Sequence, residues 1–575
     1  MTNIGAPPRV ASQSAPGGLP NTRWLWVACW VLALLLGLAQ VWASRFILKG
    51  DSMSYLDIAR AISRGHWGEA LNAHWSPLYP TVLGLALRVV GPSTGSEILF
   101  AHLVHFAFYV GALWCFSFFL RSLLDAHRSA DSKASSAGFH ALPEWAWITL
   151  GFALLTFSSL QLTHLVLLNP DLGVSAVVFL AGGLLLHIRA KPTGWRIYLI
   201  LGVLLGLAYW LKAPMFPMAF VFMFAAAVAA GNLRIALPRV GVSLLAFLIV
   251  ACPLVLALSR AQGHLTLGES AKMNLVWHLY DVDTLNWQGE PPGTGTPKHP
   301  PRKILDAPPV YSFAAHLKGT YPPWYDPAYW NDGMKARVTL RREIRAVLRD
   351  VESYYELFVL RQGTILAGIV ALLALSGTWR QVIRNLWEYA FLLVPSLGAF
   401  CMYGLVYVEP RYIAGYVVVL WLTLLSGVRL PLSPEFQRTC AAVVIFVVLV
   451  LGVQIAGRVL TDFKNESSNS PQVQWAIAEN LRHMGVAPGD TVAVAGDAVN
   501  EPWPHIAQLS IVAETRDVGR EGFWWAADPQ AKERVFQAFA ETGAKALVAD
   551  RMPAPNWSGD WQQIGNTPYF VHLLR

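Results

Sequence analysis

The feature that most constrains this chain is a succession of apolar runs that are each long enough to cross a bilayer. A spanning helix needs about 20 mostly apolar residues, because the hydrocarbon core is about 30 Å thick. The chain has 575 residues, of which 54% are hydrophobic and 14% are charged, so the bilayer is its main solvent. Eleven runs are predicted spans: Trp24 to Ala43, Ile98 to Leu120, Trp145 to His164, Leu172 to His187, Ile197 to Leu211, Pro214 to Ala230, Val240 to Leu258, Gln362 to Gly377, Tyr389 to Tyr407, Tyr412 to Gly427 and Thr439 to Gly457.

The charge of the connectors between these spans predicts their orientation. Short cytoplasmic loops are enriched in Lys and Arg, and an odd number of spans puts the two ends of the chain on opposite sides. If the N-terminus is inside, every inner connector is basic, which explains the net charge of +8 without a nucleic acid partner. We therefore predict a multi-pass protein of the bacterial inner (cytoplasmic) membrane with a cytoplasmic N-terminus. The basic residues of the inner connectors are Arg121, Arg128, Lys133, Arg189, Lys191, Arg196, Arg234, Arg239, Arg380, Arg384, Arg429 and Arg438.

Two segments decide whether this count of spans is correct. The run from Thr81 to Val90 is apolar but contains Arg88, and it covers only about half of the hydrocarbon core. We expect it to lie flat on the outer surface. The stretch from Ile197 to Ala230 is either one long helix kinked at Pro214 or two spans. The charge rule favours two spans, joined by a tight outer hairpin at Lys212.

The composition outside the spans predicts three parts. Residues 1–22 are rich in Pro, Gly, Ser and Ala and are expected to be a disordered cytoplasmic tail. Residues 23–458 form a transmembrane domain with outer loops at 44–97 and 259–361, and residues 459–575 form a small extracytoplasmic α/β domain. The five cysteines lack the spacing of metal ligands or redox pairs, so disulfides and zinc are not expected. The last part has predicted helices at Pro471 to Met484 and Pro529 to Thr542, and predicted strands at Thr491 to Ala495, Ala546 to Ala549 and Tyr569 to Leu574.

The polar residues that could carry chemistry gather at the outer ends of the spans. The cores of the spans contain almost no charged residues, whereas carriers of ions or protons usually hold such groups near the midplane. This argues against a transporter. At the outer helix ends, water and a lipid head group can both reach a side chain. The candidates there are Asp51, Tyr55, Asp171, Lys212, Arg411 and Tyr412.

The first outer segment, Gly50-Asp51-Ser52-Met53-Ser54-Tyr55, resembles the first outer loop of bacterial integral-membrane glycosyltransferases of the GT-C type. This group includes the protein O-mannosyltransferases and the aminoarabinose transferase of lipid A, in which an aspartate after the first span precedes an amphipathic surface helix. The resemblance continues at Asn169-Pro170-Asp171 and at Glu409-Pro410-Arg411-Tyr412. Ser52 stands where the family often has a second acidic residue, so no metal is assigned to that pair, and a divalent cation stays an open alternative.

The resemblance implies a polytopic α-helical fold and transfer of a hexosyl or pentosyl group from a polyprenyl phosphate to an extracytoplasmic glycan, lipid or protein. Asp51 is then the candidate general base, which takes a proton from the acceptor hydroxyl as it attacks the anomeric carbon with inversion. Asp57 lies about 240° around a helix from Asp51, so we assign it a solvated or structural role. Asp171 and Tyr55 are expected to position the substrates. The candidates for binding the donor phosphate are Lys212, Arg411, Tyr412, His299 and Arg302.

Each assignment has an alternative that the sequence leaves open. Asp51 and Asp171 could only cap helices, Lys212 could be an interfacial lysine, and Arg411 could pair with Glu409. Among functions, one alternative is an oligosaccharide ligase or polymerase that uses a lipid diphosphate donor. The other is a flippase or transporter of lipid-linked sugars.

Overall fold

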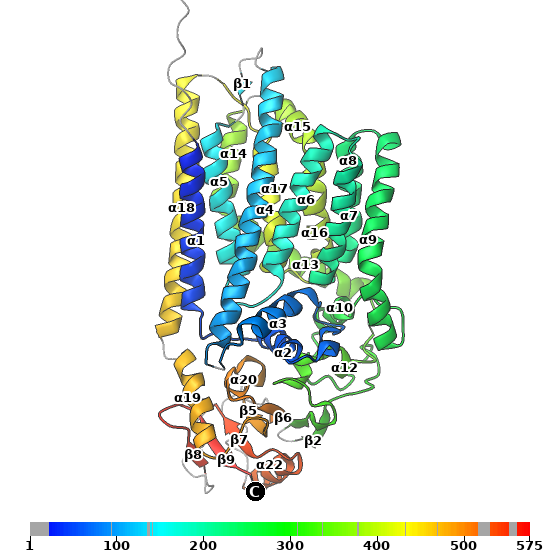
Figure 1. Ribbon diagram of the computed structural model, residues 1–575, viewed down its shortest axis with the longest axis vertical. Helices are drawn as coiled ribbons and strands as arrows, with labels where there is room; N and C mark the ends of the chain where they lie inside the picture. Colours follow the sequence, from blue (N-terminus) through cyan, green and yellow to red (C-terminus); the bar gives the residue numbers. More distant parts are fainter. Residues whose placement is uncertain are drawn as a thin grey trace, which may run out of the picture.

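The computed structural model of the chain is a helical bundle with a smaller α/β domain at one end, as the sequence predicts (Figure 1). We call the end of the bundle that carries the α/β domain the sheet end, and the opposite end the connector end. The structure describes residues 22–93, 95–134, 139–140, 142–306, 309–335, 337–376, 379–431, 433–467, 470–515, 529–550 and 561–574.

Helices occupy all of the predicted spans, but they differ in length. Among the described residues, six helices are long and apolar enough to cross a membrane, and up to eight if each bent pair is one span. The chain is therefore a multi-pass membrane protein. The six are α1 (Arg23–Ala43), α4 (Glu97–Ala134), α5 (Glu144–Phe157) with its π-helical continuation η3 (Ser158–Thr163), α6 (Asp171–Ala190), α9 (Leu233–Gln262) and α18 (Pro434–Ser467).

The other predicted spans form shorter helices. The helix α14 (Gly363–Ala374) follows α13 (Leu340–Tyr355) and η5 (Glu356–Arg361) across a bend of 73°, and α16 (Ala390–Gly404) follows α15 (Trp379–Glu388) across a bend of 82°. Helices of 16 or 17 residues cover about 25 Å at a rise of 1.5 Å per residue, close to the minimum for a span. These are α7 (Trp195–Leu211), α8 (Met215–Ala230) and α17 (Pro410–Leu425).

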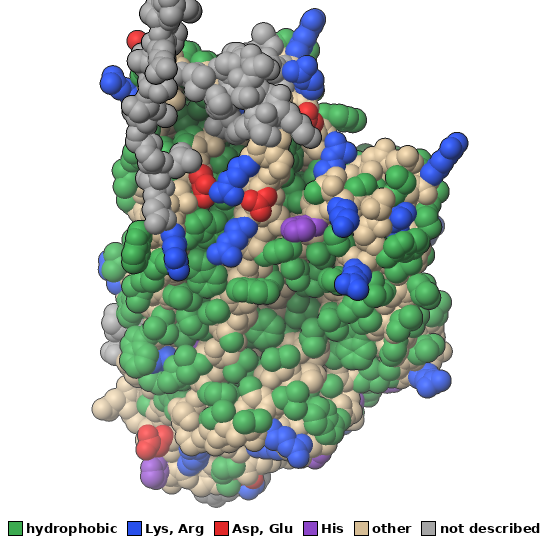
Figure 2. Space-filling view, turned by 45° about the horizontal axis from the view of Figure 1, so that its top comes forward, with side chains coloured by type: hydrophobic (Ala, Val, Ile, Leu, Met, Phe, Trp, Pro, Cys, Tyr) green, Lys and Arg blue, Asp and Glu red, His purple; other side chains and the backbone are tan. Residues whose placement is uncertain are grey.

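The surface of the bundle is that of a protein in a bilayer. Figure 2 shows Lys and Arg side chains gathered over the connector end, above a broad surface of hydrophobic side chains. On α9, for example, Leu237, Leu245 and Ile249 are each more than 60% exposed. Such a large apolar surface needs lipid around it. The two-stranded sheet of β1 (Phe139–His140) and β4 (Leu430–Pro431) and the helix α15 lie at the connector end (Figure 1).

The first predicted outer loop folds into two helices at the sheet end. The helix α2 (Asp51–Ser63) begins after Gly50, whose positive φ of 47° favours glycine, and it buries 9 of its 13 residues. The helix α3 (Leu78–Val90) contains the apolar run that we expected outside the bilayer. It packs so closely on α2 that a Cβ at Gly84 would lie 2.7 Å from the carbonyl oxygen of Ala59. This packing holds α2 firmly at the sheet end.

The α/β domain is built on a seven-stranded sheet with the order β2-β3-β6-β5-β7-β9-β8. The predicted strands are present as β5 (Thr491–Ala495), β7 (Ala546–Ala549) and β9 (Phe570–Leu573), and the predicted helices as α19 (Ser470–His483) and α22 (Pro529–Glu541). The sequence analysis missed α20 (Trp503–Ala507), β6 (Ser510–Thr515) and β8 (Trp561–Gln563).

The sheet also takes two strands from the second predicted outer loop. These strands are β2 (Arg302–Asp306) and β3 (Pro309–Ser312), and β3 pairs with β6 in antiparallel register. A domain boundary at residue 459 leaves out this partnership, because it joins segments about two hundred residues apart through short strands. The loop and the C-terminal residues therefore form one layer over the sheet end.

Candidate active site

Asp51 and Arg411 form an ion pair at the sheet end, although 360 residues separate them in the chain. Arg411 Nη2 donates to Asp51 Oδ2 at 2.7 Å, and Trp324 Nε1 donates to Asp51 Oδ1 at 3.2 Å. Asp51 is the first residue of α2, and among the described residues its carboxylate makes no capping hydrogen bond. The capping alternative is therefore wrong. The pairing of Arg411 with Glu409 is also wrong, because the Glu409 carboxylate accepts from Tyr407 Oη at 3.1 Å.

Asp171 and Lys212 form a second ion pair beside the first. Lys212 Nζ donates to Asp171 Oδ1, and it lies 3.7 Å from the centre of the Tyr412 ring. Arg411 Nε lies 3.8 Å from Asp171 Oδ2, which links the two pairs. Asp171 begins α6 without a capping hydrogen bond in the described part of the chain, and Lys212 is only 18% exposed. Asp171 is thus not a simple cap, and Lys212 is not a snorkelling lysine at the surface.

The protonation states in this group suit acid and base chemistry. Burial raises the pKa of Asp51, but the charge and hydrogen bond of Arg411 outweigh burial and hold this pKa below its usual value. Asp51 is therefore an ionised proton acceptor at neutral pH. Burial and the nearby Asp51 charge raise the pKa of Tyr55 well above its usual value, so Tyr55 keeps its proton. Burial lowers the pKa of His74 to about 4, which leaves His74 neutral.

These side chains line one cavity of about 540 Å³ that has a polar half and an apolar half. The polar half contains the two ion pairs together with Tyr55 and His74. The apolar half lies between α8 and α16, and one of its residues, Phe220, is 46% exposed on the surface of the bundle. The cavity thus connects the charged groups with the lipid-facing surface. Its apolar lining includes Phe216, Pro217, Phe220, Met402, Tyr403 and Val406.

Three buried polar atoms on the cavity wall have no hydrogen-bond partner among the described residues. They are His74 Nδ1, Asn169 Nδ2 and Asp171 Oδ2. An unsatisfied buried polar group costs about 1–3 kcal/mol, so a ligand that satisfies these atoms gains that free energy on binding. The sequence analysis did not assign His74 or Asn169 a role. The only signal for them was their place in the His74-Trp75 and Asn169-Pro170-Asp171 segments.

Two predicted phosphate-binding residues lie elsewhere. The ring of His299 stacks on Tyr329 with 4.4 Å between the ring centres, and its Nδ1 lies 3.6 Å from Asp332. Arg302 is exposed at the start of β2, on one edge of the seven-stranded sheet. Neither residue is among the described residues that line the cavity, because their loop folds against the α/β domain. The structure brings together Asp51, Tyr55, Asp171, Lys212, Arg411 and Tyr412.

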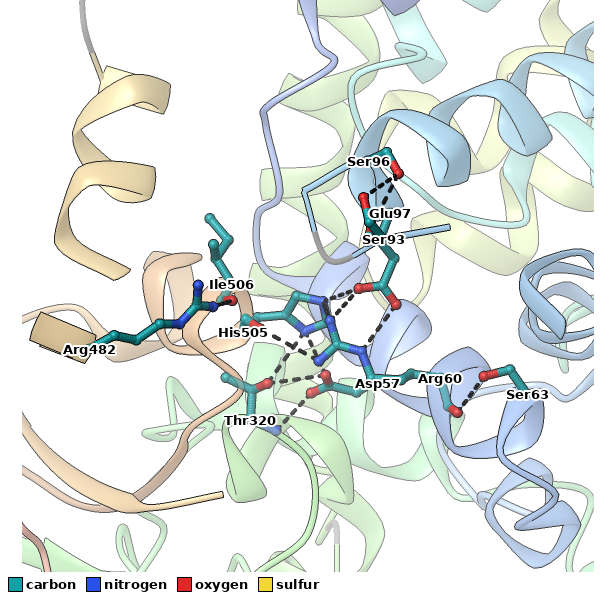
Figure 3. A network of polar contacts seen from close by, with 10 residues as sticks. All are labelled: Asp57, Arg60, Ser63, Ser93, Ser96, Glu97, Thr320, Arg482, His505 and Ile506. Carbon is teal, nitrogen blue, oxygen red and sulfur yellow. Dashed lines mark hydrogen bonds and ion pairs between the residues drawn. The ribbon is translucent and has the colours of Figure 1, made fainter. Parts of the chain in front are cut away.

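A second polar network fixes the other end of α2, as Figure 3 shows. His505 Nδ1 lies 2.7 Å from Asp57 Oδ1, and Thr320 N donates to Asp57 Oδ2 at 2.7 Å. Arg60 pairs with Glu97 and lies 2.8 Å from His505 Nε2. Asp57 is therefore structural, as the second part of the earlier expectation states, but it is buried rather than solvated. This network joins α2, α4, the loop before α11 (Pro322–Tyr325) and α20.

The part of the chain that the structure describes contains no group of three or more His, Cys, Asp or Glu residues that could hold a metal ion. In the cavity, each of the two carboxylates faces a cation instead. The site therefore supplies its positive charge through Arg411 and Lys212.

Comparison with solved structures identifies the fold. ArnT from Cupriavidus metallidurans bound to undecaprenyl phosphate matches with a TM-score of 0.58 at 11% identity, over 96% of this chain and 98% of that chain. The same protein in the apo state matches with a TM-score of 0.55 at 12% identity, over 96% and 98% of the two chains. An Archaeoglobus fulgidus oligosaccharyltransferase in complex with Zn and sulfate gives a TM-score of 0.46 at 14% identity, over 91% of this chain and 68% of that chain.

No protein-family model and no curated protein matches the sequence. The chain nevertheless has the fold of ArnT, an aminoarabinose transferase of the GT-C type, over almost its full length. The predicted GT-C likeness is therefore confirmed as a fold.

Proposed function

We propose that this chain is a membrane glycosyltransferase that transfers a sugar from a polyprenyl phosphate to an extracytoplasmic acceptor. One observation carries the proposal. A single cavity combines an ionised carboxylate, two cations and an apolar half that reaches the lipid-facing surface. A lipid-linked sugar phosphate needs all of these features, and few other substrates do. The fold of ArnT, whose structure was solved with undecaprenyl phosphate, supports the same substrate class.

The charges of the site favour a donor with one phosphate. Asp51 and Asp171 balance Arg411 and Lys212, so these four side chains carry no net charge. A phosphodiester brings one negative charge, and it can take Arg411 and Lys212 as partners while the carboxylates give them up in part. Charge-assisted contacts to phosphate are strong, and arginine offers two nitrogens to its oxygens. A lipid diphosphate would bring a second charge for which the cavity shows no further cation among its described lining.

In the proposed reaction, Asp51 acts as the general base. It accepts the proton of the acceptor hydroxyl while the bond from that oxygen to the anomeric carbon forms on one face of the sugar. The bond from the anomeric carbon to the phosphate oxygen breaks on the other face, which inverts the configuration. Arg411 and Lys212 stabilise the charge that develops on the leaving polyprenyl phosphate. Tyr55 and Asp171 position the substrates, and Tyr412 holds Lys212 through its ring.

The proposed orientation follows from the same arrangement. Polyprenyl phosphate sugars serve reactions outside the cytoplasm, and the basic connectors belong on the cytoplasmic side. We therefore assign the sheet end to the extracytoplasmic side of a bacterial inner membrane and the N-terminus to the cytoplasm. The α/β domain then covers a periplasmic active site.

Transfer by purified protein tests the proposal directly. The protein in lipid nanodiscs is incubated with radiolabelled polyprenyl phosphate sugars, with a lipid diphosphate sugar in parallel, and with a cell-envelope glycan and lipid extract as acceptor. Label should move to the acceptor from a monophosphate donor and be lost in D51N. Transfer only from the diphosphate would favour a ligase or polymerase. Movement of intact donor across a sealed vesicle, without transfer, would favour a flippase and overturn the proposal.

A further inference from the structure

A second cavity of about 410 Å³ lies against the C-terminal half of α2. Asp51 and Asp57 project about 240° apart around this helix, so the two cavities lie on different faces of it. The second cavity is formed by three parts of the chain that are distant in sequence. They are the end of α2 with Arg60 and Arg64, the loop with Thr320 and Tyr325, and the C-terminal domain with Ser510.

Buried ionic contacts build the floor of this cavity. Asp57 and Arg60 line it, and both belong to the network that includes His505 and Glu97 (Figure 3). Breaking such a buried pair costs about 3–5 kcal/mol, so the network fixes the walls in place. The proposed transfer reaction does not use any of these side chains. Their placement therefore suggests a second site that is held in a set shape.

The charge at the rim of this cavity is not balanced. Among the described residues that line it, Asp57 is the only carboxylate, and its oxygens already bind His505 and Thr320. Arg64 and His66 are exposed at the rim, and their side chains have no hydrogen-bond or ionic partner in the described part of the chain. These two side chains are thus available to an anionic group of a ligand.

The remaining lining suits a carbohydrate. Hydroxyl and backbone groups of Thr320, Ser510, Gly319 and Gly489 surround the space, and the ring of Tyr325 forms part of the wall. Sugars bind through many hydroxyl contacts and through contact with an aromatic ring, whereas a lipid tail needs an apolar wall. The apolar half of the first cavity meets that second requirement, and this cavity does not.

We propose that the second cavity binds an anionic carbohydrate, namely the part of the acceptor that is remote from the reacting hydroxyl. This inference rests on the proposed function, because it names the acceptor class for the same enzyme. Arg64 follows Asp51 by 13 residues, which is about 20 Å along a helix. An acceptor that reaches both residues must be an extended glycan with a carboxylate or phosphate several sugar units from the acceptor hydroxyl.

Direct binding without a donor tests this inference separately from transfer. Calorimetry on protein in nanodiscs measures the affinity for tetragalacturonate, which carries carboxylates, and for pentamannose phosphate, which carries a phosphate. The neutral control is mannopentaose, and the peptide control is tetraglutamate. At least one of the two anionic saccharides should bind more tightly than mannopentaose and tetraglutamate, and the saccharide that binds more tightly shows whether the anionic group is a carboxylate or a phosphate.

Variants locate the binding. R64E should weaken binding of the anionic saccharide at least tenfold, whereas the matched control R88E, an exposed arginine in the last turn of α3, should not change it. D51N should keep this binding although it loses transfer. The inference is overturned if neither anionic saccharide binds, if R64E binds as wild type does, or if tetraglutamate binds better. Wild-type protein that binds the saccharide but transfers no sugar would contradict the proposed function instead.

Discussion

Asp51 and Asp171 share one arginine, Arg411, although they begin two different helices. Arg411 Nη2 lies 2.7 Å from Asp51 Oδ2, and its Nε lies 3.8 Å from Asp171 Oδ2. The two carboxylates therefore occupy the cations that the donor phosphate needs. When the phosphate binds, it competes with both carboxylates, and this competition determines what each substitution in the site should do.

The substitution D51N separates chemistry from donor binding. An amide cannot take the acceptor proton, so we expect kcat to fall about 100-fold or more, in the range typical for loss of a general base. Donor affinity should stay equal or rise, because the amide releases Arg411 to the phosphate. Transfer kinetics and donor binding measured on the same preparation check both parts. D125N, which changes an exposed aspartate at the other end of the molecule, is the control. Wild-type transfer by D51N would rule out its role as the base.

The substitution R411K should affect the donor more than the acceptor. Lysine keeps the charge but loses the second nitrogen through which Arg411 reaches Asp171 and, in the proposed complex, the phosphate. We expect the KM for the donor to rise at least tenfold and the KM for the acceptor to change little. Steady-state kinetics with each substrate varied in turn measure this difference. R380K, in the helix α15 at the connector end, is the matched control. An equal rise in both KM values would mean that Arg411 does not act on the phosphate.

The pH dependence of transfer should reveal the same ion pair. Arg411 holds the pKa of Asp51 below its usual value despite the burial that raises it. Asp51 is ionised and active above that pKa, so kcat/KM of the wild type should be flat from about pH 5 to 7. In R411Q the raising effect of burial is no longer opposed, and the acid limb should move to higher pH. Rate profiles between about pH 4.5 and 8 show the shift. An R411Q profile that superposes on the wild type would contradict the assigned cause.

The sequence predicts this site only in its local parts. The apolar runs predict where helices form because burial in lipid is decided within one segment, and Asp51, Asp171, Lys212 and Arg411 are visible as polar residues at helix ends. Their pairing is not visible, because it depends on which helix ends meet. Arg411 reaches Asp51 across 360 residues, and Trp324 reaches it across 273. A side chain that could cap its own helix therefore looks the same in sequence as one that binds a distant arginine.

Long-range pairing also explains what was missed in the fold. The strands β5 and β7 are apolar runs between turn residues and are recognisable alone. The strands β2 and β3 are short and partly exposed, and only their contact with β6 makes them part of a sheet. Because that loop folds onto the sheet, His299 and Arg302 move away from the cavity. Asp57 and His505 likewise meet across 448 residues, and neither has a motif that announces the other.

The Asp57–His505 contact should control how the α/β domain docks. D57N leaves His505 and Arg60 without their buried partner, and loss of one member of a buried pair costs about 3–5 kcal/mol. Burial raises the pKa of Asp57, but His505 outweighs it and holds this pKa below its usual value. The stabilisation is therefore complete above the usual pKa of about 4 and is lost as pH falls through the lower folded value. Thermal unfolding and amide exchange of α20 should show the loss in D57N at neutral pH. D57N and D125N proteins of equal stability would refute this role.

The placement of the two ends of the bundle can be measured in intact cells. The five cysteines, of which Cys252 and Cys401 are exposed, are first replaced by alanine. Single cysteines are then introduced by K298C, at an exposed residue of the loop next to the sheet, and by K191C, in the connector between α6 and α7. A membrane-impermeant maleimide should label K298C in whole cells and K191C only after lysis, because the basic connectors belong to the cytoplasmic side. The reverse pattern would put the cavity on the cytoplasmic side and remove the reason for a polyprenyl phosphate donor.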